Sequence, residues 1–133
     1  RTQEVNLFLI NKSFYLVDLP GYGYAKADEG GRDKLKKIIF WYLFNSHYQQ
    51  KLVLLIIDAE VGLTANDKEI LRGLEERKKN ILIVANKVDK IKNAVYLKKL
   101  QEIQKMAGDH KVIPYSAEKK IGITELTEEL FKK

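Results

Sequence analysis

Three short, almost continuous apolar runs constrain the fold of this chain more than any other feature. They extend from Leu52 to Asp58, from Ile81 to Ala85 and from Val112 to Tyr115. Runs of strand length that are this rich in Leu, Val and Ile are typical of parallel strands covered on both faces. Parallel strands need long crossover connections, which are usually helices. The runs therefore predict an α/β fold with a mostly parallel sheet.

Helical periodicity fills the segments between and after these runs. The expected buried faces are Leu35, Ile38, Ile39, Tyr42 and Leu43; Ile70, Leu71 and Leu74; Leu97, Leu100, Ile103 and Ala107; and Ile123, Leu126, Leu130 and Phe131. A polar loop over residues 27–31 precedes the first helix. Thr64 to Asp67 resembles a capping box that opens the second, and Gly108 is the expected cap of the third. The aromatic cluster Phe40, Trp41, Tyr42 and Phe44 is assigned to the buried face of the first helix, except for Trp41, whose burial the pattern does not predict.

Two further strands are expected near the start of the chain. Val5 to Ile10 and Phe14 to Asp18 are separated by Asn11-Lys12, a plausible tight turn, so they should form an antiparallel hairpin. The whole prediction is one α/β domain over residues 1–133, with a mostly parallel sheet and one antiparallel edge hairpin.

Composition narrows the class of protein further. The chain is 45% hydrophobic and 32% charged, a soluble globular balance, and no apolar run reaches membrane-spanning length. The absence of cysteine excludes disulfides and thiolate metal sites and fits a reducing cytoplasm. The net charge of +6 makes a polyanionic partner plausible, although a solvated lysine-rich surface explains the charge equally well.

Polar signatures follow three of the predicted strands. The first is Asp18-Leu19-Pro20-Gly21. A carboxylate at the carboxyl end of a strand, next to a glycine that admits close approach of the backbone, suits a phosphate that carries a magnesium ion. The alternative is an ordinary Pro-Gly turn at a strand end, and this motif alone favours that alternative.

The second signature, Asn86-Lys87-Val88-Asp89, points to guanine. The carboxylate of Asp89 can accept two hydrogen bonds at once, and guanine offers two adjacent donors, its ring N–H and its amine. Adenine presents an acceptor there and leaves the carboxylate unpaired. Asn86 can bond the other edge of the base, and the aliphatic stem of Lys87 can cover the ring. A chance match is the alternative for this motif alone.

The third signature, Ser116-Ala117-Glu118, follows Tyr115 at the end of the last predicted strand. The backbone N–H groups of Ser116 and Ala117 are candidates to bond the guanine carbonyl oxygen. In a parallel sheet the three strand ends lie on one edge, so the three loops can converge on one ligand.

These motifs resemble the third, fourth and fifth signature motifs of P-loop GTPases of the TRAFAC class. The closer resemblance is to the EngB family of bacterial GTP-binding proteins. It is carried by Arg1-Thr2-Gln3, by Asn6 and Leu9-Ile10-Asn11, and above all by Val17-Asp18-Leu19-Pro20-Gly21-Tyr22-Gly23-Tyr24-Ala25. The resemblance covers the whole chain and implies a three-layer P-loop GTPase-like fold.

The resemblance also implies roles for individual residues. Thr2 resembles the switch I threonine that reaches Mg²⁺, and Asp18 would hold that ion through water. Gly21 would donate its N–H to the γ-phosphate of GTP. The residues implied in nucleotide binding are Asp18, Leu19, Pro20, Gly21, Asn86, Lys87, Val88, Asp89, Tyr115, Ser116 and Ala117. Residues 22–31 would form switch II.

Two departures from the wider GTPase pattern matter. Tyr22 stands where Ras-like enzymes carry a water-orienting glutamine, which implies slow hydrolysis, and no catalytic residue is assigned. No G-x-x-x-x-G-K-[ST] motif occurs in the chain. We therefore expect the first strand, the phosphate-binding loop and the first helix to lie upstream of Arg1, and the isolated segment to bind nucleotide poorly.

At the level of function, the resemblance implies a GTP- and GDP-dependent switch in assembly of the large ribosomal subunit, and links to cell division and septation. Its partners would be guanine nucleotide and the rRNA and ribosomal proteins of the subunit precursor. The protein would be a cytoplasmic monomer that does not bind a membrane. One alternative is a pseudo-GTPase without a P-loop that serves as an RNA or protein docking module. Another is a different GTPase of the same class.

Overall fold

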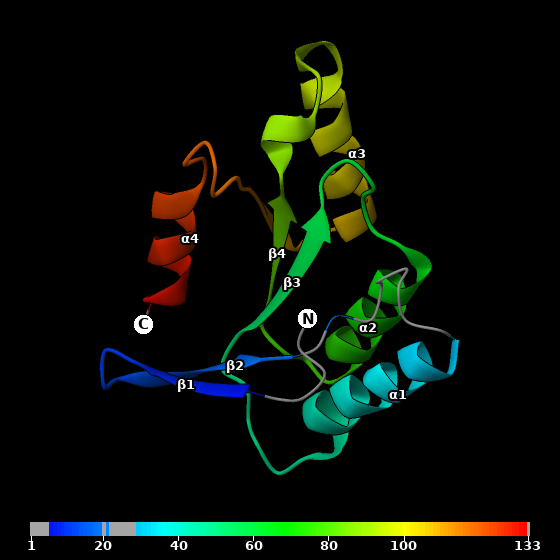
Figure 1. Cartoon of the computed structure of the whole chain (residues 1–133), viewed down its shortest axis with the longest axis vertical. Coiled ribbons are helices and arrows are strands. Elements are labelled where there is room, and N and C mark those ends of the chain that lie inside the picture. Colours follow the sequence, from blue (N-terminus) through cyan, green and yellow to red (C-terminus); the bar gives the residue numbers. More distant parts are fainter. Residues whose placement is uncertain (1–5, 20, 22–28, 133) are drawn as a thin grey trace. The chain divides into compact units, whose positions relative to one another are not determined.

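The structure is a computed structural model of the chain and describes residues 6–19, 21 and 29–132, without the side chains of residues 29, 30 and 32 (Figure 1). The chain divides into two compact units, Arg1–Gln49 and Gln50–Lys133. Thr2, Pro20 and Tyr22, and with them most of the predicted switch segments, lie outside the described residues.

The first unit contains the predicted hairpin. Strands β1 (Asn6–Ile10) and β2 (Phe14–Asp18) pair antiparallel and form a two-stranded sheet. Asn11 and Lys12 between them have φ values of 50° and 57°, as a tight turn with left-handed central residues requires. The Ser13 N–H closes the turn on the Ile10 carbonyl at 2.9 Å. The hairpin and its turn are confirmed.

Helix α1 (Glu29–Phe40) follows and continues directly into a π-helical turn, Trp41–Asn45. Tyr42 and Leu43 are buried, as the periodicity predicts, and Trp41 is 52% exposed. The expectation of a loop through residue 31 was wrong, because the helix already begins at residue 29. Glycines 30 and 31 lie in its first turn, where backbone N–H groups have no helical acceptor. The free-energy cost of glycine there is small compared with the helix propensity of the residues that follow.

The second unit is built on a three-stranded parallel sheet in the order β3-β4-β5. The strands are β3 (Val53–Asp58), β4 (Ile81–Asn86) and β5 (Lys111–Pro114). Asp58 pairs in register with Asn86, and Ala85 with Pro114, so the carboxyl ends of all three strands lie along one edge. The parallel sheet and the common edge are therefore confirmed for these strands.

Three helices cover this sheet. Helix α2 (Ala65–Glu76) and helix α3 (Tyr96–Ala107) lie on one side of the strands, and α4 (Ile123–Leu130) lies on the other (Figure 1). Short 3₁₀ turns, η2 (Val88–Lys90) and η3 (Asn93–Val95), connect β4 to α3. The second unit therefore has the predicted three layers.

Helix α2 begins with the predicted capping box. The Thr64 hydroxyl accepts from the Asp67 N–H at 3.2 Å, and the Asp67 carboxylate accepts from the Thr64 N–H at 2.8 Å. Each side chain thus satisfies a backbone donor that the helix leaves without a partner. Gly108 ends α3 with φ of 69°, which confirms the predicted cap.

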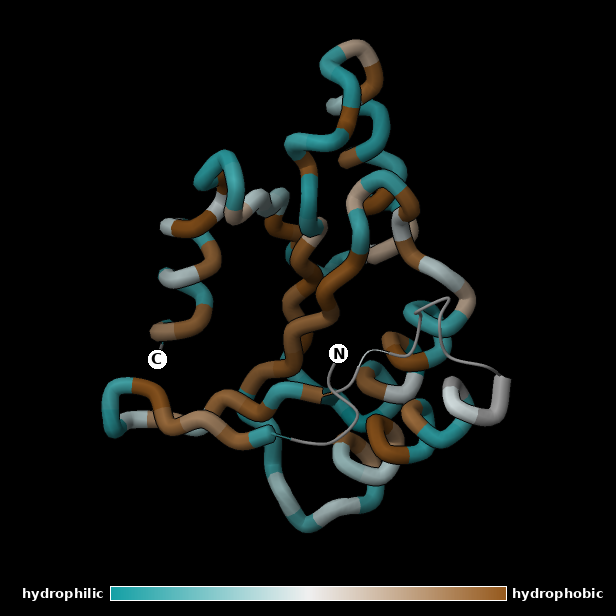
Figure 2. The backbone as a smooth tube through the Cα atoms, viewed as in Figure 1, coloured by the Kyte–Doolittle hydropathy of each residue, from teal (hydrophilic) through white to brown (hydrophobic). Residues whose placement is uncertain are grey.

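The main core lies between the sheet and helices α2 and α3. Its buried residues are Leu55, Ile57, Ala59, Leu63, Leu71, Ile83, Ala85, Val88, Ile91, Ile103 and Ala107. Figure 2 shows apolar residues concentrated along β3 and β4, with polar residues at the loops. Within the described ranges, no helix is long and apolar enough to cross a membrane.

Three predicted core positions are exposed in the structure. Leu97 is 72% exposed, and Tyr96 packs against the core in its place together with Leu100. The helix begins at Tyr96, so its inner stripe continues through Ile103 and Ala107 from that residue. Ile123 at the start of α4 and Phe131 just after its end are exposed, and Leu126 and Leu130 are half-buried, so the predicted buried face is incomplete.

Candidate functional site

The candidate site begins where β4 ends. The Asn86 side-chain carbonyl accepts the Lys87 N–H at 2.9 Å, and the Asn86 backbone carbonyl accepts the Ala59 N–H at 2.9 Å. Lys87 has a left-handed backbone, with φ of 64° and ψ of 37°. This conformation costs a residue with a Cβ about 1 kcal/mol. It persists only where surrounding contacts stabilise it, as is typical of functional sites.

Backbone hydrogen bonds join the loop after β4 to the loop after β5. The Tyr115 N–H donates to the Ala85 carbonyl at 2.8 Å, and the Val88 N–H donates to the Tyr115 carbonyl at 3.1 Å. Val88 is 1% exposed and belongs to the core. Backbone hydrogen bonds therefore hold these two loops together, as the sequence predicted.

A side-chain hydrogen bond completes the connection. The Ser116 hydroxyl donates to Oδ1 of Asp89 at 2.8 Å, and the Ser116 residue is 1% exposed. This hydrogen bond is the largest cause that lowers the pKa of the Asp89 carboxyl below its ordinary value, and the cations of Lys90 and Lys119 act in the same direction. Asp89 is thus ionised at neutral pH and can act only as an acceptor.

The backbone of Ser116 forms a bridge with Ile121. Its N–H donates to the Ile121 carbonyl at 3.0 Å, and the Ile121 N–H donates back to Ser116 at 3.0 Å. In this structure the bridge occupies the Ser116 N–H, and its role in binding a base stays a prediction. Among the described residues, the N–H of Ala117 has no acceptor, so it is available for a carbonyl oxygen.

Gly122 fixes this loop against the sheet. Its φ is 78°, and a Cβ built on it would lie 2.1 Å from the Pro114 carbonyl oxygen. No real Cβ approaches a backbone oxygen so closely, so only glycine fits the position without a shift of the chain. The backbone on either side of the Ser116 bridge is thereby held close to β5.

The sequence did not predict the position of Lys90 at this site. The Lys90 ammonium lies 3.7 Å from Oδ2 of Asp89 and 3.6 Å from Oε2 of Glu118. Lys90 directly follows the second signature, which ends at Asp89, and Glu118 is the last residue of the third. The sequence shows that residues 90 and 118 carry opposite charges. It does not show which lysine pairs with which acid, because that depends on how the loops fold.

The predicted phosphate and magnesium residues belong to the first unit. Asp18 is exposed at the end of β2, opposite Asn6 in the hairpin register, and Leu19 and Gly21 are half-buried. Thr2 and Pro20 lie outside the described residues. Among residues 6–19, 21 and 29–132, no three acidic or histidine side chains cluster as metal ligands. The magnesium and phosphate assignments therefore stay predictions.

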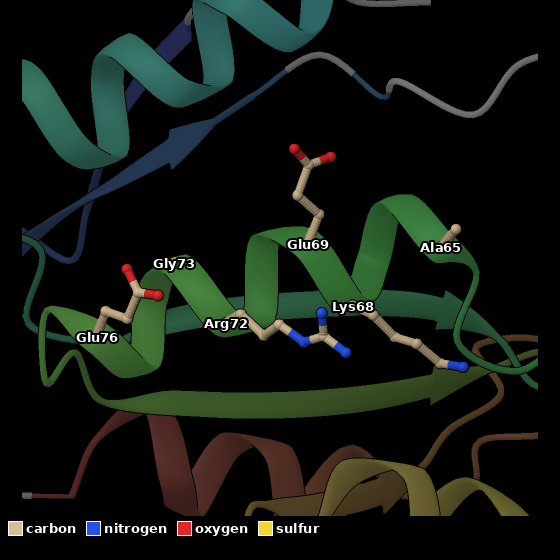
Figure 3. A pocket seen from close by; sticks show the side chains of 6 residues that line it. All are labelled: Ala65, Lys68, Glu69, Arg72, Gly73 and Glu76. Carbon is tan, nitrogen blue, oxygen red and sulfur yellow. The ribbon is translucent and has the colours of Figure 1, made fainter.

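A shallow surface depression runs along α2 and is separate from these loops (Figure 3). Its lining residues follow one helical stripe and are Ala65, Lys68, Glu69, Arg72, Gly73 and Glu76. In Figure 3 the Lys68 and Arg72 side chains extend to one side of the helix, whereas Glu69 extends to the other. Neither the loop after β4 nor the loop after β5 contributes a residue to it.

Comparison with known proteins decides the family. The profile of the Elongation factor Tu GTP binding domain matches residues 43–133. A Thermosipho africanus protein named "Probable GTP-binding protein EngB" is 39% identical over 129 residues, which are 96% of this chain and 66% of that protein. The Clostridium perfringens protein of the same name is 37% identical, over 98% of this chain and 68% of its own length. This chain belongs to the EngB family.

Solved structures agree on the fold. A crystal structure of a probable EngB GTP-binding protein superposes with a TM-score of 0.85 at 18% identity, and covers 98% of this chain and 81% of its own. Era, solved with MgGDPNP and nucleotides of 16S ribosomal RNA, superposes with a TM-score of 0.69 at 25% identity, over 98% of this chain and 44% of its own. The predicted P-loop GTPase-like fold is confirmed.

This EngB chain spans about two thirds of the length of its relatives, since it covers 66% of the Thermosipho protein and 65% of the Clostridioides difficile protein, to which it is 38% identical.

Proposed function

We propose that this EngB chain carries the base-binding part of a guanine-nucleotide switch, in which Asp89 reads guanine. The observation that supports this most strongly is the Ser116–Asp89 hydrogen bond of 2.8 Å, which holds an ionised, largely buried carboxylate at the junction of two loops. The bond leaves acceptor capacity on the carboxylate for the two adjacent N–H donors of guanine. Adenine offers no such pair, so it would leave the charge without a partner.

Neighbouring residues complete the base site in this proposal. The N–H of Ala117 binds the guanine carbonyl oxygen, and the stem of the exposed Lys87 covers one face of the ring. Asn86 uses its side-chain carbonyl to hold the Lys87 turn, which leaves its amide group to face the base.

Residues of the first unit would bind the phosphates and their magnesium ion in this proposal. The exposed Asp18 carboxylate at a strand end suits a hard cation that prefers oxygen ligands and retains water. Asp18 and Thr2 would hold Mg²⁺, which neutralises phosphate charge when bound, and Gly21 would donate its N–H to the γ-phosphate. Leu19 and Pro20 would connect these two groups. GTP hydrolysis would be slow, because Tyr22 cannot orient water as a glutamine does.

The proposed setting is assembly of the large ribosomal subunit in the cytoplasm, with rRNA and ribosomal proteins as partners of a monomer. A net charge of +6 supports contact with RNA. The likeness to Era, whose solved structure includes ribosomal RNA, supports the same class of partner.

The test is calorimetric titration of the full-length protein with GDP, GTP and ATP in magnesium buffer. We expect guanine nucleotides to bind, ATP to bind far more weakly, and Asp89→Ala to lose GDP binding. Asp109→Ala is the matched control, because Asp109 is an exposed aspartate in another loop of the same unit. Equal affinity for ATP would contradict guanine reading. No nucleotide binding by the full-length protein would favour the docking module.

A further inference from the structure

The two oxygens of the Asp89 carboxylate have different neighbours. Oδ1 accepts the Ser116 hydroxyl at 2.8 Å. Oδ2 has the Lys90 ammonium 3.7 Å away, beyond hydrogen-bond distance. Among the described residues, Oδ2 therefore has no side-chain hydrogen bond, and a cation lies beside it.

The Lys90 ammonium is shared between two carboxylates. It lies 3.6 Å from Glu118 and 3.7 Å from Asp89, so neither pair is in close contact. The side chains of Lys90 and Glu118 are 55% and 66% exposed, whereas that of Asp89 is 8% exposed. An exposed ammonium can move between two such partners with little change in energy, because surface ion pairs are weak.

A guanine base bound by Asp89 would share Oδ2 with the Lys90 ammonium. The base would bring neutral N–H donors, whereas the ammonium attracts Oδ2 electrostatically from 3.7 Å. Glu118 offers the ammonium a second carboxylate at 3.6 Å, which would remain its partner when a base occupies Asp89. The charge at position 118 therefore controls how strongly Lys90 opposes the base.

We propose that Glu118 and Lys90 set the affinity of the site for guanine, with Glu118 holding the Lys90 ammonium away from the base-reading oxygen of Asp89. The inference rests on the proposed function, since it assumes that Asp89 binds guanine. Lys90 and Glu118 are positioning residues, because they act through Asp89 and need no contact with the base.

The experiment measures GDP affinity of full-length variants at low and high salt. We expect Glu118→Gln to weaken GDP binding about 2- to 5-fold at low salt, the range that surface ion pairs usually provide, and to lose this effect at high salt. Glu128→Gln is the control, because Glu128 is an exposed glutamate on α4. In a Lys90→Ala background, Glu118→Gln should have no effect, because the ammonium that it releases is absent.

The GDP affinities of these variants can support or overturn the proposed role of Glu118 and Lys90. Unchanged or tighter GDP binding by Glu118→Gln would overturn the inference, and so would a loss of affinity that persists in the Lys90→Ala background or at high salt, since that loss would come from loop structure. Thermal melting of each variant provides the readout for such a structural change. If the wild-type protein does not bind guanine, or if Asp89→Ala binds it equally well, the proposed function fails, and the inference fails with it.

Discussion

Replacement of Gly122 by alanine should destabilise the protein strongly, for two separable reasons. A left-handed backbone costs a residue with a Cβ about 1–2 kcal/mol, and Gly122 has φ of 78°. The new Cβ would also lie 2.1 Å from the Pro114 carbonyl oxygen, where about 3.3 Å is the normal limit for carbon and oxygen. Overpacking of this kind costs about 1–3 kcal/mol after relaxation. The expected loss of unfolding free energy is therefore about 2–5 kcal/mol.

Urea denaturation of the full-length protein measures this loss, with Gly62→Ala as the control. Gly62 has φ of 81°, but its added Cβ would meet only Met106 Cε at 3.4 Å, an ordinary contact. Gly62→Ala therefore carries the backbone cost without the clash and should lose about 1–2 kcal/mol. Because the strained loop carries Ser116, Gly122→Ala should also weaken GDP binding. Equal destabilisation by the two substitutions would refute the argument from the Pro114 contact.

Three further predictions follow from the same contacts. Ser116→Ala should weaken GDP binding about 10- to 100-fold, because it removes a hydrogen bond to a charged carboxylate; Ser13→Ala, in the hairpin turn, should leave binding unchanged. The lowered pKa of Asp89 stabilises the fold at pH values above the ordinary pKa of 3.8, and this contribution should be lost as the pH falls through the folded-state pKa. Ser116→Ala should therefore reduce the dependence of the unfolding free energy on pH in the acid range, as measured by urea denaturation at a series of pH values. Lys78→Gly should raise the unfolding free energy by about 0.5–1 kcal/mol, because Lys78 has φ of 54° where α2 ends and glycine adopts that conformation freely; an unchanged or lower value would contradict this.

Local patterns in the sequence predicted the fold well. The Thr64 capping box, the Asn11-Lys12 turn and the Gly108 cap were all identified, because each depends on residues close together in the chain. The phase of α3 was not, since Tyr96 and Leu97 are both apolar and only the packed helix shows which one faces the core.

The candidate site was predictable to the same extent. The motifs located Asp89 and Ser116, and the parallel sheet explained why their loops meet. The hydroxyl contact between them, the bridge that occupies the Ser116 N–H, and the position of Lys90 between two acids depend on side chains from different loops. No spacing rule within one segment encodes such contacts.

The most direct test of the central claim is a change of base preference at Asp89. Asparagine offers one donor and one acceptor in place of two acceptors. Xanthine presents one donor and one carbonyl oxygen on the edge where guanine presents two donors, so it matches asparagine. We expect Asp89→Asn in the full-length protein to lose affinity for GDP and to gain affinity for xanthosine diphosphate. A variant that binds GDP as tightly as the wild type would contradict the claim that Asp89 reads guanine.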